Sequence, residues 1–451
     1  MKKIYIETLG CAKNTVYSEV MAGLLSSGTF ELTDLPHEAE VIIVNTCGFI
    51  TAAKEESINT LLAYADYKES GKLELLIALG CLVQKYADEL KSAMPEVDLF
   101  LGTTGYDHIV EIIQEYYGHS TDPIQVDTYW RLPGTEDYAG RLVSTPDHYA
   151  YLSIAEGCNN RCSYCAIPDM QGPYRSRASE DIIAEAKKLA AEGIRELIVI
   201  AQDTTYYGID LTGKPQLANL LHELCQVPGL DWIRVLYAYP DHITDDLIHC
   251  FKTEEKLCHY IDIPLQHIDD AILASMRRHI TRAEIEDILA RFRQAVPDMV
   301  FRSTFITGYP GESDEQFDQL LQFLRKAKLD RVGVFPYSQE DHTPAGQMTN
   351  QVPEDVREER AERLMEEQFQ IMQDKHRAAE GEVREAVIEE ISPDIPGLYL
   401  ARSYAEAPEI DPFILLKAAP GTLQVGEVVQ VRLTGVDEYD LVGELIIDEL
   451  A

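Results

Sequence analysis

The sequence has 451 residues, of which 45% are apolar and 26% charged, a composition typical of a globular protein with two or three domains. Its 77 acidic residues outnumber 39 Lys and Arg residues, giving a formal net charge of −38 that argues against sequence-independent binding to nucleic-acid phosphates. This balance suits solubility or a basic protein partner. No apolar run typical of a signal peptide or membrane helix is present, so we expect a cytoplasmic protein without a membrane partner.

Residues 1–120 alternate short apolar runs with helical patterns. The runs are "KIYIETLG", "VIIVNT", "LELLIALG" and "VDLFLGTT", and helices are expected near 14–27, 51–68, 82–93 and 105–117. Apolar strands alternating with helices predict a parallel sheet covered on both faces. We therefore expect an N-terminal doubly wound domain of the α/β class. Residues 121–147, rich in Pro, Gly, Thr and Asp, are predicted to be a linker.

Residues 148–375 repeat a strand-then-helix pattern six times. The expected strands are "YAYLSIAEG", "ELIVIAQD", "WIRVLYAYP", "YIDIPLQ", "MVFRSTFITG" and "RVGVFPYS", with a charged helix over 353–379. Ser179 is expected to cap a helix that Gly193 closes, and Thr281 with Glu284 predicts a capping box. Six such units predict an open (βα)6 partial barrel, whose chemistry lies at the carboxyl ends of the strands.

Residues 376–451 change to short β runs separated by Gly and Pro turns, which predict a small all-β barrel.

Three cysteines, Cys158, Cys162 and Cys165, follow the first barrel strand in the spacing Cys-x3-Cys-x2-Cys. Nine cysteines in a cytosolic chain favour metal binding or catalysis over disulfides. If three thiolates hold a four-iron cluster, one iron keeps an open position where a substrate or cofactor binds. The alternative is a structural zinc ion completed by a distant His or Cys.

A second set of three, Cys11, Cys47 and Cys81, is spread along the N-terminal domain, but each member ends a predicted parallel strand. Ligands of open α/β sheets gather at the carboxyl ends of the strands, so these residues are able to converge. The pattern favours a second three-thiolate cluster over three buried structural cysteines. The remaining cysteines lie in or beside apolar patterns and are expected to be packing residues: Cys225, Cys250 and Cys258.

The stretch "CNNRCSYC", with Tyr164 before the last cysteine, resembles the signature of the radical S-adenosylmethionine superfamily. In that superfamily the open iron binds the amino and carboxylate groups of S-adenosylmethionine, which is cleaved to a radical that abstracts hydrogen. The stretches "LGCAKNTVYSE", "NTCGFI" and "GCLVQKY" extend the resemblance to the methylthiotransferase family over essentially the whole chain, with a C-terminal domain of the TRAM type. The resemblance implies two [4Fe-4S] clusters, the N-terminal one delivering sulfur beside the substrate. It also implies a second S-adenosylmethionine as methyl donor and a reductant protein such as a flavodoxin.

The charge of the C-terminal region points to one branch of that family. Residues 376–451 hold 16 acidic and 5 basic residues, which makes direct nucleic-acid binding unfavourable. "LGCAKN", "DIPLQHI" and "RSYAEAPEID" resemble the branch that modifies the β-carbon of an aspartate in small-subunit ribosomal protein twelve. Tyr17 departs from the expected "TVDSE", where Asp stands. The alternatives are methylthiolation of a transfer RNA adenosine and a non-catalytic iron–sulfur electron carrier or sensor.

Polar residues near the strand ends are further candidates. By resemblance Gln202 and Asp203 lie where the superfamily contacts the amino group of S-adenosylmethionine; the alternative is a turn in which Asp203 caps a helix. The residues expected to contact the cofactor are Tyr164, Gln202, Asp203, Gln266, Arg302, Thr304 and Gly308.

The candidates for catalysis are Arg175, Arg177, His267 and Tyr337. Either arginine is able to pair with a carboxylate of cofactor or substrate, and the alternative is a solvated loop. For His267 the alternative is a hydrogen-bonded core histidine.

Overall fold

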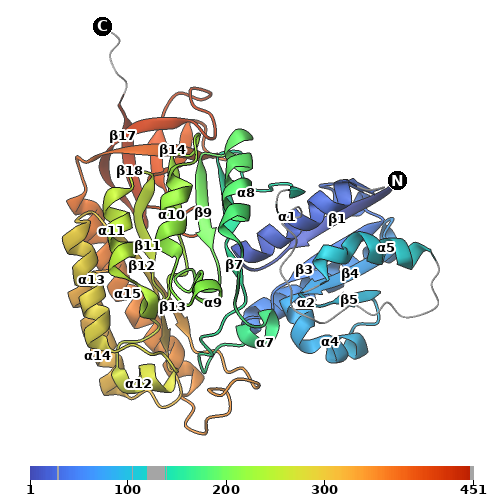
Figure 1. Ribbon diagram of the computed structural model, residues 1–451, viewed down its shortest axis with the longest axis horizontal. Coiled ribbons are helices and arrows are strands. Elements are labelled where there is room, and N and C mark those ends of the chain that lie inside the picture. The colour runs from blue at the N-terminus through green and yellow to red at the C-terminus, as the bar shows by residue number, and fades with distance from the viewer. Residues whose placement is uncertain (28–29, 104, 119–137, 139, 447–451) are drawn as a thin grey trace.

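The computed structural model describes residues 1–27, 30–103, 105–118, 138 and 140–446. In this part of the chain a parallel N-terminal sheet, an open six-stranded barrel and a closed five-stranded barrel follow one another (Figure 1). The predicted fold class is therefore confirmed. The predicted domain boundaries stay predictions, and residues 121–137 and 139 of the predicted linker lie outside the described residues.

The N-terminal sheet has five parallel strands in the order β2-β1-β3-β4-β5. They are β1 (Lys2–Thr8), β2 (Phe30–Leu32), β3 (Val41–Thr46), β4 (Leu75–Gly80) and β5 (Leu99–Leu101). Every residue of β3 and β4 is buried, because helices cover both faces of the sheet. β2 was not expected, since three residues are too few to carry a period-two pattern.

The helices of this domain lie close to the predicted ranges. They are α1 (Ala12–Ser26), α2 (Thr51–Ala65), α3 (Tyr67–Ser70), α4 (Cys81–Ala93) and α5 (Ile109–Tyr117), with short 3₁₀ turns η1 (Pro36–Glu38) and η2 (Tyr106–His108).

The central barrel has six parallel strands in chain order, β6-β9-β10-β11-β12-β13. They are β6 (Tyr149–Ser153), β9 (Glu196–Ile200), β10 (Trp232–Val235), β11 (Leu257–Asp262), β12 (Val300–Thr307) and β13 (Arg331–Pro336). A two-stranded ribbon of β7 (Ala155–Glu156) and β8 (Arg175–Ser176) frames the loop that carries the first three barrel cysteines.

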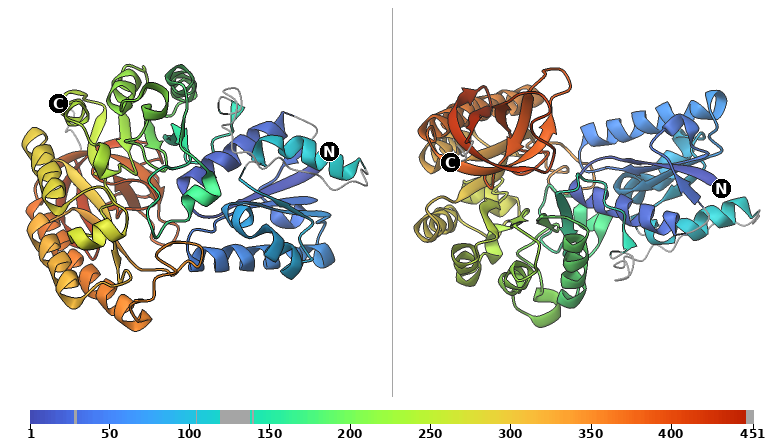
Figure 2. Two further views of the ribbon diagram at one scale, coloured as in Figure 1. Left: turned by 60° about the horizontal axis from the view of Figure 1, so that its bottom comes forward. Right: turned by 90° about the horizontal axis from the view of Figure 1, so that it is seen from above.

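Helices cover the outer face of the barrel sheet (Figure 2). They are α8 (Ser179–Ala191), α9 (Ile209–Thr212), α10 (Leu217–Cys225), α11 (Asp245–Thr253), α12 (Asp270–Ser275), α13 (Arg282–Ala295), α14 (Asp314–Ala327) and α15 (Glu354–Ala378), with the 3₁₀ turn η3 (Pro240–His242). The short helix α7 (Ile167–Gln171) instead lies against α4 of the N-terminal domain. The described residues include no helix with both the length and the hydropathy needed to span a bilayer.

The predicted helix caps are partly confirmed. The Thr281 hydroxyl accepts a hydrogen bond from the Glu284 N–H, and the Glu284 carboxylate accepts one from the Thr281 N–H, so the capping box is present. Gly193 follows the end of α8 with φ +109°, as expected of a helix stop. The prediction for Ser179 was wrong: Ala178 is the N-cap, and the Ser179 hydroxyl donates to the Glu180 carboxylate instead.

The C-terminal strands close into a barrel in the order β14-β15-β16-β18-β17. They are β14 (Val383–Ile391), β15 (Leu398–Arg402), β16 (Ile414–Lys417), β17 (Val428–Asp437) and β18 (Asp440–Leu445). Closure leaves no free strand edge. The predicted packing cysteines Cys225, Cys250 and Cys258 are all buried in the cores, as expected.

Buried ion pairs attach this small barrel to the base of the central one. The carboxylate of Glu196, at the start of β9, lies 2.9 Å from Arg234 Nε and 2.5 Å from Arg402 Nη1. Glu389 pairs with Arg402 at 2.7 Å. The two arginines are almost fully buried, so they depend on these carboxylates for charge compensation.

The segment 403–411, part of the "RSYAEAPEID" stretch, packs on the face of the sheet opposite the helices. Glu409 accepts hydrogen bonds from the hydroxyls of Tyr149 and Tyr151 at 2.8 and 2.9 Å. Asp411 accepts one from Tyr260 at 2.7 Å. The segment therefore fills the inner side of the barrel with acidic side chains that tyrosines hold in place.

Replacing Glu196 with Gln should destabilise the protein by about 3 kcal/mol, because two buried arginines lose a shared counter-charge. Thermal and urea unfolding under anaerobic conditions would measure the change. Asp231→Asn is the matched control, since it breaks a solvent-exposed pair with Arg195 and should change stability by less than ~0.5 kcal/mol. Equal losses in the two variants would show that the buried pairs do not hold the domains together.

Candidate cysteine centres

The three N-terminal cysteines lie at one edge of their sheet. Cys11 follows β1 and precedes α1, Cys47 directly follows β3, and Cys81 is the first residue of α4 after β4. Because β1, β3 and β4 are neighbours in the sheet, their carboxyl ends bring the three loops together.

A glycine beside each of these cysteines permits the close approach. A Cβ on Gly10 would lie 2.7 Å from Cβ of Cys47, and one on Gly48 would lie 2.7 Å from Cα of Leu82. Gly80 has φ +107°, which other residues rarely adopt, and a Cβ there would lie 2.7 Å from the carbonyl oxygen of residue 46. The analysis of the sequence did not single out these glycines, although the Gly–Cys or Cys–Gly pair recurs at all three positions.

The three barrel cysteines share one tight loop between β7 and α7. Cys158 N–H donates to the Gly172 carbonyl at 3.1 Å, and Cys165 N–H donates to the Cys162 carbonyl at 3.0 Å. Burial raises the pKa of the Cys158 thiol to about 12, and it does the same for Cys81. Metal binding would therefore release protons from these thiols. Among the described residues, no three or more His, Cys, Asp or Glu side chains are gathered closely enough to hold a single metal ion.

An arginine missed by the sequence analysis lies beside the barrel cysteines. Arg278 is 4% exposed, and its guanidinium stacks 4.2 Å from the ring centre of Tyr239, whose hydroxyl is 3.8 Å from Cys162 Sγ. It donates to the Tyr164 hydroxyl at 3.3 Å and to the Pro264 carbonyl at 2.6 Å.

Arg278 makes no direct ion pair with a described carboxylate, although Asp241 is near enough to interact with it electrostatically, and its buried Nε has no hydrogen-bond partner among the described residues. A buried cation without a counter-charge in direct contact is costly. An anionic group at the three thiols, as an iron–sulfur cluster held by thiolates would be, supplies that counter-charge. The residues present therefore fit such a group, and the Tyr164 hydroxyl contacts Arg278 beside it.

Asp203 is connected to the cysteine loop. Its carboxylate accepts from Asn160, which lies between Cys158 and Cys162, at 2.8 Å. It also accepts from the Thr205 hydroxyl at 2.6 Å, so the turn of the alternative exists, but Asp203 caps no helix there, because α9 begins at Ile209 after Gly208. Gln202 is half-buried at the end of β9.

Two of the catalytic candidates are buried against carboxylates. Arg177 pairs with Glu185 at 2.7 Å and donates to the Ser153 carbonyl. His267 is fully buried, with Nε2 3.3 Å from a Glu312 carboxylate oxygen. Both arrangements are those of structural residues, and the structure favours the core alternative for His267. Neither side chain is available to a substrate in this arrangement.

Arg175 differs from Arg177. It is half-buried, donates to the Pro173 carbonyl at 2.7 Å, and makes no ion pair with a described residue.

Arg302 in β12 is already neutralised. Its Nη1 lies 2.8 Å from Asp262, and its Nε lies 3.8 Å from Asp411 in the inner segment. Thr304 is half-buried on the same strand, and Gln266 has φ +71° beside it. Positive φ at non-glycine residues also occurs at Arg161 and Tyr237, so strained backbone gathers around the barrel mouth.

Gly308 and Tyr337 both pack against Arg357. Gly308 has φ +68°, a Cβ there would collide with Arg357, and its N–H donates to Glu312. This close approach is to Arg357, whereas the expectation was a close approach to adenosine. The Tyr337 ring lies 5.3 Å from the Arg357 guanidinium, and its buried hydroxyl has no partner among the described residues.

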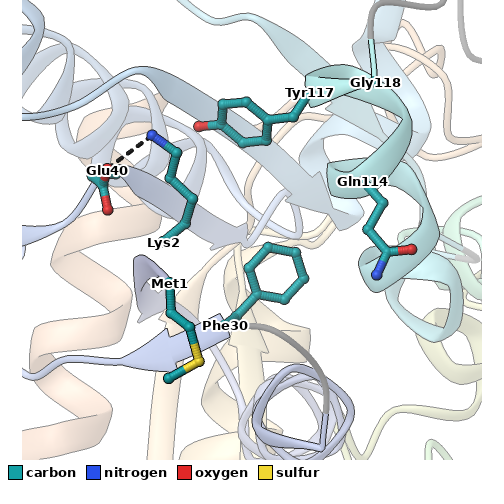
Figure 3. Close-up of a pocket in the computed structure, with 7 residues that line it drawn as sticks. All are labelled: Met1, Lys2, Phe30, Glu40, Gln114, Tyr117 and Gly118. Carbon is teal, nitrogen blue, oxygen red and sulfur yellow. Dashed lines mark hydrogen bonds and ion pairs between the residues drawn. The ribbon is translucent and has the colours of Figure 1, made fainter.

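A cavity of about 590 Å³ opens elsewhere, at the amino ends of β1 and β2, the edge of the sheet remote from the cysteines. An ion pair of Lys2 and Glu40 at 2.8 Å crosses one side of it (Figure 3). The lining residues are Met1, Lys2, Phe30, Glu40, Gln114, Tyr117 and Gly118. It has no part in the arrangement of the thiols.

Three family models match separate stretches of the chain. Residues 3–102 match the Uncharacterized protein family UPF0004, residues 152–324 match the Radical SAM superfamily, and residues 381–446 match the TRAM domain.

Solved structures share the fold at low sequence identity. The radical S-adenosylmethionine methyltransferase TsrM from Kitasatospora setae, solved with cobalamin and a [4Fe-4S] cluster, has a TM-score of 0.58 and 14% identity, with 76% of this chain and 74% of that chain covered. The cobalamin-dependent S-adenosylmethionine radical enzyme OxsB has a TM-score of 0.54 and 12% identity, covering 82% of this chain and 58% of that chain.

Relatives of similar length are much closer in sequence. The ribosomal protein uS12 methylthiotransferase RimO of Acetivibrio thermocellus is 46% identical over 99% of this chain and 98% of its own length. The protein of the same name from Geobacter sulfurreducens is 45% identical over 99% of both chains. The chain therefore belongs to the RimO family of methylthiotransferases, enzymes of the radical S-adenosylmethionine superfamily that combine the three matched domains.

Proposed function

We propose that this enzyme adds a methylthio group to the β-carbon of an aspartate in ribosomal protein uS12. The observation that carries the proposal is the pair of three-cysteine sets, each at strand ends, in a chain that matches uS12 methylthiotransferases over its full length. An electron carrier would need neither a second set nor a barrel open to a substrate.

In this proposal Cys158, Cys162 and Cys165 hold a [4Fe-4S] cluster whose open iron takes S-adenosylmethionine. Together these groups supply the one-electron chemistry that activates a C–H bond. The chain's own contribution is electrostatic and steric. Arg278 offsets negative charge in a buried site, and the Asn160–Asp203 hydrogen bond fixes the shape of the cysteine loop.

Cys11, Cys47 and Cys81 are proposed to hold the second cluster, which delivers sulfur. Tyr237 supports this placement, because it follows β10 of the barrel and its pKa is raised by burial and then by the nearby Cys11. The N-terminal set therefore faces the barrel mouth, where a substrate side chain would have to enter. A reductant protein such as a flavodoxin would supply the electrons.

The surface charge favours a basic protein substrate. The C-terminal region, with 16 acidic against 5 basic residues, would repel transfer RNA phosphates. The same charge would attract a basic ribosomal protein in the cytoplasm and speed its encounter with the enzyme.

The deciding experiment offers small ribosomal subunits and transfer RNA in parallel to anaerobically reconstituted enzyme with reductant, sulfide and S-adenosylmethionine. Mass spectrometry of both products should find one methylthio group on an aspartate of uS12. A gain on a nucleoside would select the transfer RNA activity instead. No gain on either substrate, with no 5′-deoxyadenosine released, would favour the electron carrier.

Replacing single cysteines should separate the two roles. Cys162→Ala should abolish cleavage of S-adenosylmethionine, since the site for the cofactor is lost. Cys47→Ala should keep cleavage while methylthio transfer disappears, because only sulfur delivery depends on that set. Chromatography of 5′-deoxyadenosine beside product mass measures both. Normal methylthiolation by the Cys47 variant would refute this division.

Replacing Gly48 with Ala tests whether the N-terminal loops must touch. The new Cβ would meet the α4 backbone at 2.7 Å and push the loops of Cys47 and Cys81 apart. We expect the variant to lose roughly half of its bound iron after reconstitution, as one of two clusters fails to form. Iron and sulfide analysis would measure this. Gly435→Ala is the control, because a Cβ at that position meets nothing within 4 Å. Full iron content in the Gly48 variant would argue against a centre shared by these loops.

A further inference from the structure

A glutamine of the barrel contacts a cysteine of the N-terminal domain. Gln171 Nε2 lies 3.1 Å from Cys81 Sγ, within hydrogen-bond distance. Gln171 ends α7, which lies between the barrel and the N-terminal domain (Figure 1), and it is 5% exposed. It is six residues beyond Cys165, so the loop that carries one cysteine set also contacts a sulfur of the other.

A second contact of this amide lies on its other side. The Tyr17 hydroxyl, which donates to the Glu156 carboxylate, also lies 3.3 Å from Gln171 Oε1. In the structure the amide oxygen faces Tyr17 and the amide nitrogen faces Cys81. A thiolate accepts hydrogen bonds and donates none, so an N–H facing the sulfur is the arrangement that a ligating Cys81 requires.

The Tyr17 hydroxyl is held in turn by the buried carboxylate of Glu156. Glu156 accepts from the Tyr138 hydroxyl at 3.1 Å and lies 3.1 Å from Lys13 Nζ, which also donates to the Ala155 carbonyl at 2.7 Å. Glu156 is two residues before Cys158, and Lys13 is two residues after Cys11. The chain of contacts from Cys81 through Gln171 and Tyr17 to Glu156 therefore joins the two cysteine loops.

We propose that Gln171 is a positioning residue that ties the N-terminal cysteine centre to the barrel loop. Its N–H orients the Cys81 sulfur and stabilises negative charge on it, which raises the reduction potential of a cluster bound there. Because Gln171 lies on α7, it also holds the sulfur-delivering centre at a fixed position relative to the site where S-adenosylmethionine is cleaved. The positioning role in sulfur delivery rests on the proposed function. The effect on the reduction potential does not, because it is measured without a substrate.

The first test isolates the N-terminal centre. In the full-length chain with Cys158, Cys162 and Cys165 replaced by Ala, only the N-terminal set is left to bind a cluster. Adding Gln171→Met, which keeps the length of the side chain but removes the donor, should shift the midpoint potential to a more negative value. Redox titration followed by electron paramagnetic resonance measures it.

Thr103→Val is the matched control, since its hydroxyl donates 2.9 Å to the Met170 carbonyl on the same helix but reaches no cysteine. It should leave the potential unchanged. The same potential in the Gln171 and parent proteins would overturn the proposed hydrogen bond to sulfur.

The second test uses the six-cysteine enzyme. Gln171→Met should retain cleavage of S-adenosylmethionine yet release about 10-fold more 5′-deoxyadenosine per methylthio group, because a small misplacement strongly reduces productive transfer. Thr103→Val should keep the parent ratio. A parent ratio in the Gln171 variant would overturn the positioning role. If the parent itself transfers no methylthio group, the proposed function fails, and the potential measurement alone decides the role of Gln171.

Discussion

The arrangement of the two cysteine centres depends on one buried ion pair between domains. Lys13 and Glu156 approach to 3.1 Å with side chains that are 3% and 2% exposed. Each residue is two positions from a cysteine, so the pair fixes the Cys11 and Cys158 loops against each other. Breaking it would leave a buried charge without its partner, which makes any alternative docking of the domains unfavourable. The relative position of the two cysteine loops is thus set by this ion pair as well as by apolar packing.

A second set of ion pairs with a buried carboxylate joins the N-terminal domain to the segment that follows β13. Glu340, after β13, is buried and lies 2.7 Å from Lys54 of α2 and 3.5 Å from Lys85 of α4. In a chain with a net charge of −38, these few lysines are placed where carboxylates are buried between domains. The N-terminal domain is therefore held against the barrel both beside the Cys11 loop and through α2 and α4, the helices that follow β3 and β4.

The sequence was sufficient for the order of elements and for placing three of the cysteines at one edge of the N-terminal sheet, because strand–helix alternation is a local signal and strand ends of a parallel sheet share one edge. It was not sufficient for contacts between distant residues. Arg278 is more than a hundred residues from the cysteines that it faces, and no periodic pattern marks it. Local patterns also did not reveal which strand-end residues have packing partners. Gly308 is required by the close approach of Arg357, and His267 is buried against Glu312, although both follow strands as site residues do.

The substitution at position 17 is explained by the same buried carboxylate. The family pattern led us to expect Asp there, and Tyr17 instead donates its hydroxyl proton to Glu156 in a site that is almost fully buried. A second carboxylate so close to Glu156 would require either a proton or another cation, and Lys13 is the one cation that pairs with Glu156 among the described residues. Tyrosine avoids that repulsion and also reaches the amide of Gln171. Tyr17 and Glu156 are therefore matched to each other, and the departure from the pattern preserves the contact between the two cysteine loops.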